Sequence, residues 1–254
     1  MQLFETRTRV GQVGIWGVLA VLAMPSLRQL PAEELATPYA RMAPIDEYLM
    51  DRNAEITLAR SAAPASISKD ATVLVLGPKG YETAVQGKSG FVCMVERGWV
   101  GTLDWSEMWN PKIRGADCLN PPAARSILPL ARLRTEMLLA GDSRVEVIDR
   151  IREALGKGEL PPLEPGAMSY MMSKASYLTD SAGHNCPHLM FFMPVADGVT
   201  WGAGLPGSPV SSVPYWLFGN GGVSQEASGL PPVRIFTVGV PKWSDGTVAS
   251  CHMH

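Results

Sequence analysis

Apolar residues recur along the chain in short blocks, and several of these blocks predict β-strands. A run rich in β-branched and apolar residues, bounded by glycine or proline, is typical of a buried strand. A shorter run at 81–85 lies between glycine-containing turns, so the first part of the chain predicts an antiparallel meander with tight connections. We expect residues 188–193 to pair with 167–172. The five main runs lie at residues 71–76, 91–95, 167–172, 188–193 and 233–240.

Apolar positions spaced three or four residues apart predict helices elsewhere. Residues 45–60 form the first, with Pro44 at its entry and Asp46 and Glu47 in the first turn, where the helix dipole favours acidic side chains. It stops before Ala63-Pro64.

Residues 130–156 predict an αα-hairpin. One apolar stripe ends at Gly141, and a second follows Ser143 and Glu146, which have the S-x-x-E spacing of a capping box. Gly156 then marks the end of the second helix.

Strands and helices do not alternate regularly, which disfavours a parallel doubly wound sheet. We expect an α+β fold, with a mostly antiparallel sheet and both the αα-hairpin and the N-terminal helix packed on one face. The chain has 254 residues, of which 46% are hydrophobic, so it can bury a sizeable core. We expect residues 44–254 to form a single globular domain, without internal repeats.

The first 24 residues have the features of a secretory signal peptide. Arg7 and Arg9 precede an apolar stretch at 10–24, and Val21-Leu22-Ala23 supplies residues suited to cleavage. The stretch is shorter than the roughly 20 residues that cross a bilayer, although a retained anchor is the alternative. Residues 25–43 are proline-containing and predict an irregular arm or linker. We therefore expect a secreted or periplasmic protein with no membrane span after cleavage.

Export changes the interpretation of the four cysteines. In an oxidising compartment an even number of cysteines indicates disulfides more often than metal. Three pairings exist, and we expect Cys93 with Cys118, because the loop between them is short and rich in Pro and Trp. That choice leaves Cys186 with Cys251.

Composition excludes one class of partner. The formal net charge is -2 and no run of Lys and Arg occurs, so the chain has no basic surface that could follow a phosphate backbone. We expect no nucleic-acid partner.

Two short motifs resemble catalytic sequences and fail on context. Gly87-Lys88-Ser89 lacks the glycine that a phosphate loop needs five residues earlier, where Glu82 stands, and a strand follows instead of a helix. Residues 66–69 match S-x-x-K, but the companion motifs of serine acyl-enzymes come in the wrong order. The chain has no G-x-S-x-G elbow.

His184-x-Cys186-x-His188 is the densest group of metal-ligand residues. Alternation in an extended segment would project all three side chains to one side, which suits zinc or copper. Pro187 distorts that alternation, and a disulfide at Cys186 would remove the sulfur. The candidate metal ligands are therefore His184 and His188. The alternative has His184 solvated on a turn and His188 hydrogen-bonded at the start of its strand.

Two loops rich in aromatic residues could line a ligand site, since binding residues concentrate on loops held by a scaffold. The first also carries Asp104 and Glu107, and carboxylates beside aromatic rings are used in carbohydrate chemistry. Local packing is the simpler explanation for its three tryptophans. The second loop spans 195–232. The candidate ligand-binding residues are Trp105, Trp109, Trp201, Tyr215 and Trp216.

These features support three hypotheses of function. The leading one is an exported protein that binds a small molecule or glycan at aromatic loops on an antiparallel sheet. The alternative is a metal-dependent hydrolase or redox enzyme with its site on His184 and His188. The second alternative is a structural or interaction module of the cell envelope. No motif identifies a family, and catalytic status, ligand and oligomeric state stay open.

Overall fold

The computed structural model describes residues 38–181, 186–215 and 231–250. In this part of the chain eight strands form one mixed sheet, in the order β2-β1-β3-β4-β5-β6-β8-β7. Six of the seven pairings are antiparallel, and β1 with β3 is parallel. The predicted α+β class is confirmed. The strands are β1 (Thr72–Gly77), β2 (Gly80–Val85), β3 (Val92–Glu96), β4 (Gly115–Leu119), β5 (Met168–Met171), β6 (His188–Met193), β7 (Val210–Pro214) and β8 (Arg234–Gly239).

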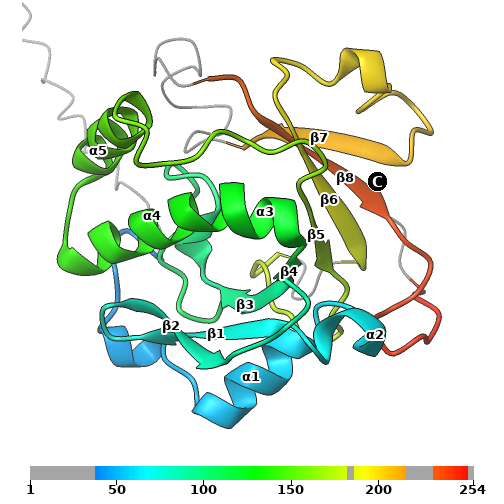
Figure 1. Ribbon diagram of the computed structural model, residues 1–254, viewed down its shortest axis with the longest axis horizontal. Coiled ribbons are helices and arrows are strands. Elements are labelled where there is room, and N and C mark those ends of the chain that lie inside the picture. Colours follow the sequence, from blue (N-terminus) through cyan, green and yellow to red (C-terminus); the bar gives the residue numbers. More distant parts are fainter. Residues whose placement is uncertain (1–37, 182–185, 216–230, 251–254) are drawn as a thin grey trace, which may run out of the picture. The chain divides into compact units, whose positions relative to one another are not determined.

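Helices cover both faces of this sheet. Figure 1 shows α3, α4 and α5 on one side and α1 and α2 on the other, so the expectation that all helices pack on one face is wrong. The α-helices are α1 (Arg52–Arg60), α2 (Ala65–Ser68), α3 (Pro121–Ser126), α4 (Leu128–Ala140) and α5 (Arg144–Gly156). Three single turns of 3-10 helix are η1 (Ile45–Glu47), η2 (Gly98–Val100) and η3 (Val199–Trp201).

The central strands are apolar on both faces, which is why helices can pack on each. Along β1, Leu74 faces the core that includes α4, while Val73 faces the core beside α1. The same holds in β3, where Met94 and Cys93 point to opposite faces. Such near-continuous apolar runs are typical of strands buried on both sides.

The first helix begins later than predicted. The expected helix at 45–60 is divided into the turn η1 and helix α1, which starts after Asp51. The Asp51 side chain accepts a hydrogen bond from the backbone N–H of Ala54 at 2.9 Å, and this cap defines the new start. Tyr48, in the break, is fully buried and accepts a hydrogen bond from the N–H of Ala43.

The predicted ends of the next helices are confirmed. Helix α4 ends at Gly141, whose φ of 94° is the left-handed conformation that glycine favours. Helix α5 starts after Ser143, and both hydrogen bonds of the capping box with Glu146 are present.

Strand β3 does not continue the meander predicted from the sequence. It pairs with β1 on the side away from β2 and runs parallel to β1, so the connection from β2 crosses the start of β1. The N–H groups of Lys88 and Ser89 both donate to the carbonyl of Asp70 there. A Cβ on Gly87 would lie 2.2 Å from the backbone nitrogen of Thr72. The glycine of the phosphate-loop-like motif therefore permits this close crossing.

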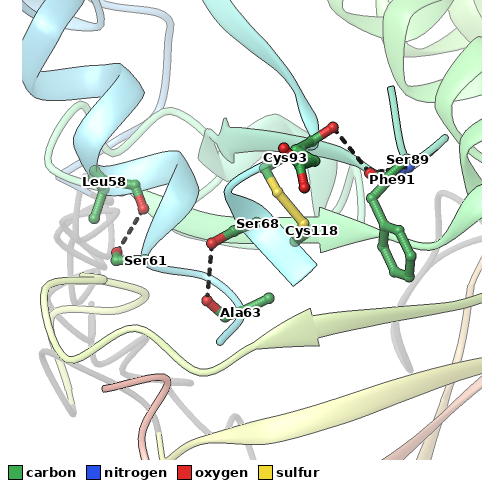
Figure 2. The surroundings of a disulfide bond; sticks show 9 residues. Leu58, Ser61, Ala63, Ser68, Ser89, Phe91, Cys93 and Cys118 are labelled. Atoms are coloured by element: carbon green, nitrogen blue, oxygen red, sulfur yellow. Dashed lines mark hydrogen bonds between the residues drawn. A yellow bond between two sulfur atoms is a disulfide. The ribbon is translucent and has the colours of Figure 1, made fainter. Parts of the chain in front are cut away.

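The predicted Cys93–Cys118 disulfide is confirmed. The two residues lie directly opposite each other on β3 and β4, and Figure 2 shows the bond beside Ser68 of α2. Strand pairing, and not loop closure alone, brings the two sulfur atoms together. Cys186 is also disulfide-bonded, and Cys251, its predicted partner, lies outside the described residues.

Other expectations concern segments that the structure does not describe. The signal peptide at 1–24 and most of the arm at 25–43 lie outside the described residues. Within the described ranges, no helix combines the length and apolar character needed to cross a membrane.

Candidate functional site

An apolar pocket of about 230 Å³ lies between the helical layer and the β7–β8 end of the sheet. A dry apolar cavity of about 150 Å³ is large enough for benzene. This pocket can therefore hold a substituted ring or a chain of medium length. Most of its wall comes from Ile127, Leu130, Leu155, Leu160, Leu163 and Val233, together with five prolines.

The pocket is apolar because of how its segments are built. Leu130 of α4 lines it, and the chain after α5 adds Leu160, Pro161 and Pro162 to the wall. Proline has no N–H to offer a ligand. Ser126 supplies a hydroxyl, but that group already donates to the carbonyl of Pro122 at 2.8 Å within α3. Polar contacts in this part of the wall are therefore scarce.

Tyr215 is the predicted ligand-binding residue that lines the pocket. Its ring packs edge-on against Phe192, with the ring centroids 5.4 Å apart. Its backbone N–H donates to the carbonyl of Val233, which ties the end of β7 to the entry of β8. Burial raises the pKa of the Tyr215 hydroxyl well above its usual range, so the side chain is neutral.

An acid pair, of which Asp117 is fully buried and Glu96 partly buried, lies in the central strands of the sheet. Glu96 on β3 and Asp117 on β4 lie on the sheet face toward α4, where each carboxyl group shifts the pKa of the other. Burial raises the pKa of Asp117 to about 7, and burial together with the Asp117 charge raises the pKa of Glu96 well above its usual range. The nearby Arg134 guanidinium opposes the shift at Glu96.

This pair can hold a proton, but its position does not suit chemistry on a bound molecule. Burial raises the pKa of both carboxyl groups, so both shifts favour a protonated pair. Neither carboxyl group lines the pocket. A general acid or base must come within hydrogen-bonding distance of the reacting group. The geometry thus supports binding in the pocket more directly than catalysis.

The other predicted aromatic residues lie elsewhere. Trp109 packs against the buried ring of Trp99 with the centroids 6.2 Å apart, and Trp201 lies over Phe236 at 4.8 Å. Trp105 lies against Gly101 in the same loop as Trp109. Trp216 lies outside the described residues. The structure therefore brings Tyr215, and not Trp105, Trp109 or Trp201, to the pocket, and the binding role of the tryptophans stays a prediction.

Of the two candidate metal ligands, the structure describes only His188. His188 is buried, and its Nδ1 lies 2.8 Å from the carbonyl oxygen of Cys186. Burial lowers the pKa of His188, which favours the neutral ring. Among the residues that the structure describes, no group of three or more His, Cys, Asp or Glu side chains could hold a metal. His184 lies outside them, so the zinc or copper site stays a prediction.

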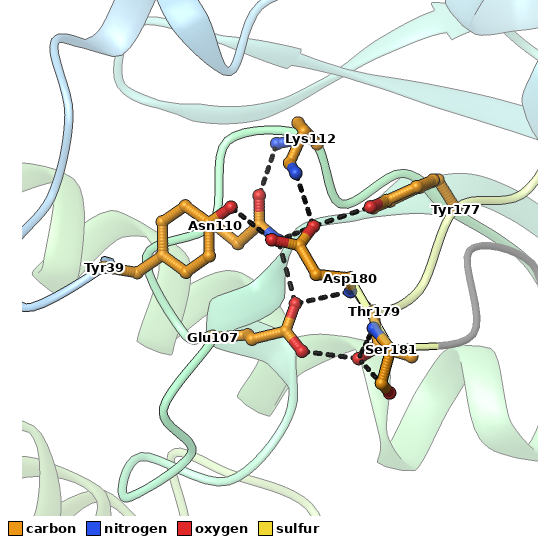
Figure 3. Close-up of polar contacts among 8 residues, drawn as sticks. All are labelled: Tyr39, Glu107, Asn110, Lys112, Tyr177, Thr179, Asp180 and Ser181. Carbon is orange, nitrogen blue, oxygen red and sulfur yellow. Dashed lines mark hydrogen bonds and ion pairs between the residues drawn. The ribbon is translucent and has the colours of Figure 1, made fainter. Parts of the chain in front are cut away.

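Sequence reasoning missed a polar network centred on Asp180 (Figure 3). The Asp180 carboxylate accepts hydrogen bonds from the hydroxyls of Tyr39 and Tyr177 and pairs with Lys112. The Lys112 ammonium also lies 5.9 Å and 5.6 Å from the centroids of the two tyrosine rings. These contacts, led by Lys112, hold the pKa of Asp180 well below its usual range.

Glu107 belongs to this network and has no free oxygen for carbohydrate chemistry. It accepts hydrogen bonds from the hydroxyl of Thr179 and from the backbone N–H of Asp180. Burial raises its pKa, but these bonds and one from Asn110 together lower it. The network fastens the segment at Tyr39 to two loops, and no local signal could reveal contacts among residues so far apart in sequence.

No protein-family model, curated protein or solved structure matches this chain. Function must therefore be inferred from the site.

Proposed function

We propose that this protein is exported and binds a small apolar molecule in the pocket beside Tyr215. The observation that carries the proposal is the pocket itself, with its volume of about 230 Å³ and its wall of leucine, proline and tyrosine. Ligand sites are mostly apolar, with few polar groups, and are largely formed before the ligand arrives.

The chemistry of the pocket wall favours an apolar small molecule over a glycan, the two ligand classes expected from the sequence. Glycans are bound through hydrogen bonds and exposed aromatic faces, whereas this wall presents aliphatic side chains and prolines. A substituted benzene, an indole or a chain of medium length fits the volume. Each would gain from leaving water, at roughly 25 cal/mol for every Å² of apolar surface buried.

The test uses toluene, indole and 1-octanol as probes in titration calorimetry and thermal unfolding. We expect at least one probe to bind and to raise the unfolding temperature. At a free concentration 100 times Kd the stabilisation should reach about 2.7 kcal/mol. Leu163→Trp, which fills the pocket from a partly exposed position, should abolish binding.

Val145→Trp is the matched control, because it adds the same side chain to an exposed position on α5. It should bind the probes as the parent does. Failure of every probe, or equal binding by the Leu163→Trp variant, contradicts the proposal. Stoichiometric zinc or copper that is lost in a folded His188→Ala variant would instead favour the metal-dependent enzyme.

A further inference from the structure

Exposed apolar side chains are concentrated in one segment. Large hydrophobic residues in the described part of the chain are strongly exposed at six positions, and four of these lie between residues 199 and 213. The exposed fractions are 74% for Val199, 47% for Trp201, 60% for Leu205 and 52% for Val213. Val145 and Val248 are the other two. A cluster of this kind marks an interaction surface, whereas single exposed residues need no explanation.

The same segment carries no charge. From Gly198 to Tyr215 the sequence has no Asp, Glu, Lys or Arg. The flanking charges are Asp197, which caps the N–H of Val199, and Arg234, which donates to the carbonyl of Ala196. The loop is apolar and uncharged, and charged residues border it. It therefore complements a surface with an apolar interior and a polar margin.

Most backbone N–H groups of the loop are hydrogen-bonded within the protein, so few would lose a partner if the loop left water. Eight N–H groups between Val199 and Val210 are hydrogen-bonded inside the protein, at residues 199, 201, 202, 203, 204, 205, 208 and 210. Pro206 and Pro209 have no N–H. An unpaired backbone group is costly in lipid, so this pairing lowers the cost of moving the loop into an apolar environment.

Trp201 is held in place by the sheet. Its ring lies 4.8 Å from that of Phe236, which is fully buried in β8. One part of the indole is therefore packed and the remainder is exposed. Tryptophan held in this way is favoured at the boundary between lipid headgroups and acyl chains.

We propose that the loop at residues 199–205 inserts into the headgroup boundary of a phospholipid bilayer. The three exposed side chains present only a few hundred square ångströms, whereas a stable protein interface needs roughly 800 Å² from each partner. A second copy of the chain would thus be held weakly. Shallow insertion of a few apolar side chains needs no such area.

The test places a fluorescent reporter at the loop itself. The structure shows no free cysteine in its described part, so Leu205→Cys provides a single thiol for an environment-sensitive nitrobenzoxadiazole label. With phosphatidylcholine vesicles we expect a blue shift of its emission and quenching by doxyl-labelled lipid. The response should persist in high salt and without anionic lipid, because the loop carries no charge. Trp201→Ser in the same labelled chain should weaken the partition at least tenfold.

Val145→Cys, labelled in the same way, is the control at an exposed apolar position outside the loop. Its emission should not shift, even if the N-terminal segment brings the chain to the vesicles. The proposal fails if both labels respond alike or if neither responds. It also fails if the Leu205→Cys label shifts without vesicles as protein concentration rises, since that result would indicate self-association.

Discussion

At the scale of single residues, Glu96 and Asp117 are two neighbouring carboxyl groups whose pKa values are both raised. Asp117 is fully buried and Glu96 partly buried, and Asp117 Oδ1 has no hydrogen-bond partner among the described residues. Burying a carboxylate is costly, so the fold favours the protonated forms.

We predict that the protein loses stability as pH rises through neutrality. Burial raises the folded-state pKa of Asp117 to about 7 from an ordinary value of 3.8, so the folded state binds more protons between these values. The stabilisation is complete below pH 4 and declines as pH rises through 7. A shift of this size corresponds to roughly 4 kcal/mol. Urea unfolding at pH 5 and pH 8 measures the part of this that is lost above pH 5, which is roughly 3 kcal/mol.

Asp117→Asn tests the assignment, because it removes the titrating group and keeps the shape. The urea midpoints of the variant at pH 5 and pH 8 should differ less than those of the parent. Glu136→Gln, at an exposed position on α4, is the control and should keep the dependence of the parent. An equal slope in the parent and in Asp117→Asn would exclude Asp117 as the source.

At the scale of elements, local signals explain the ends of helices better than the choice of strands. Ser143 and Gly141 define the boundary between α4 and α5 through contacts within a few residues. Strand β4 has no such signal, since the apolar residues of Gly-Ala-Asp-Cys-Leu follow neither the spacing of a helix nor the alternation of a strand. Its five residues are all buried because β3 and β5 pair with it on either side.

Loss of the capping box should therefore have a local and modest effect. Ser143→Ala removes the hydroxyl that accepts the N–H of Glu146, and we expect a loss of about 1 kcal/mol in the free energy of unfolding. Ser143→Asn should retain most of the stability, since asparagine is also a good N-cap. Urea unfolding of both variants checks this, and an equal loss in both would show that the cap is not the cause.

At the scale of the whole molecule, the disulfide joins two strands at the centre of the sheet. Cys93 and Cys118 are 25 residues apart, and both are fully buried in the core beside α1. The covalent bond reduces the freedom of the unfolded chain between them.

Replacing both cysteines by alanine should destabilise the protein by about 3.5 kcal/mol, the value expected for a separation of 25 residues. Urea unfolding of oxidised protein measures the change, and the sheet signal in circular dichroism should persist. A double variant as stable as the parent would show that strand pairing alone holds β3 and β4 together. The single variant Cys93→Ala would leave an unpaired thiol and is a poorer test.

Sequence alone determined the features that depend on neighbouring residues. It located six strands, the cap at Ser143 and the glycine that ends α4, because hydrophobic period and turn chemistry act between neighbouring residues. It also located the pair Cys93–Cys118, because four cysteines allow only three pairings. Tertiary structure decided what depends on contacts between distant segments. The parallel placement of β3, helices on both faces, the acid pair and the pocket beside Tyr215 arise from side chains that meet only after the sheet has formed.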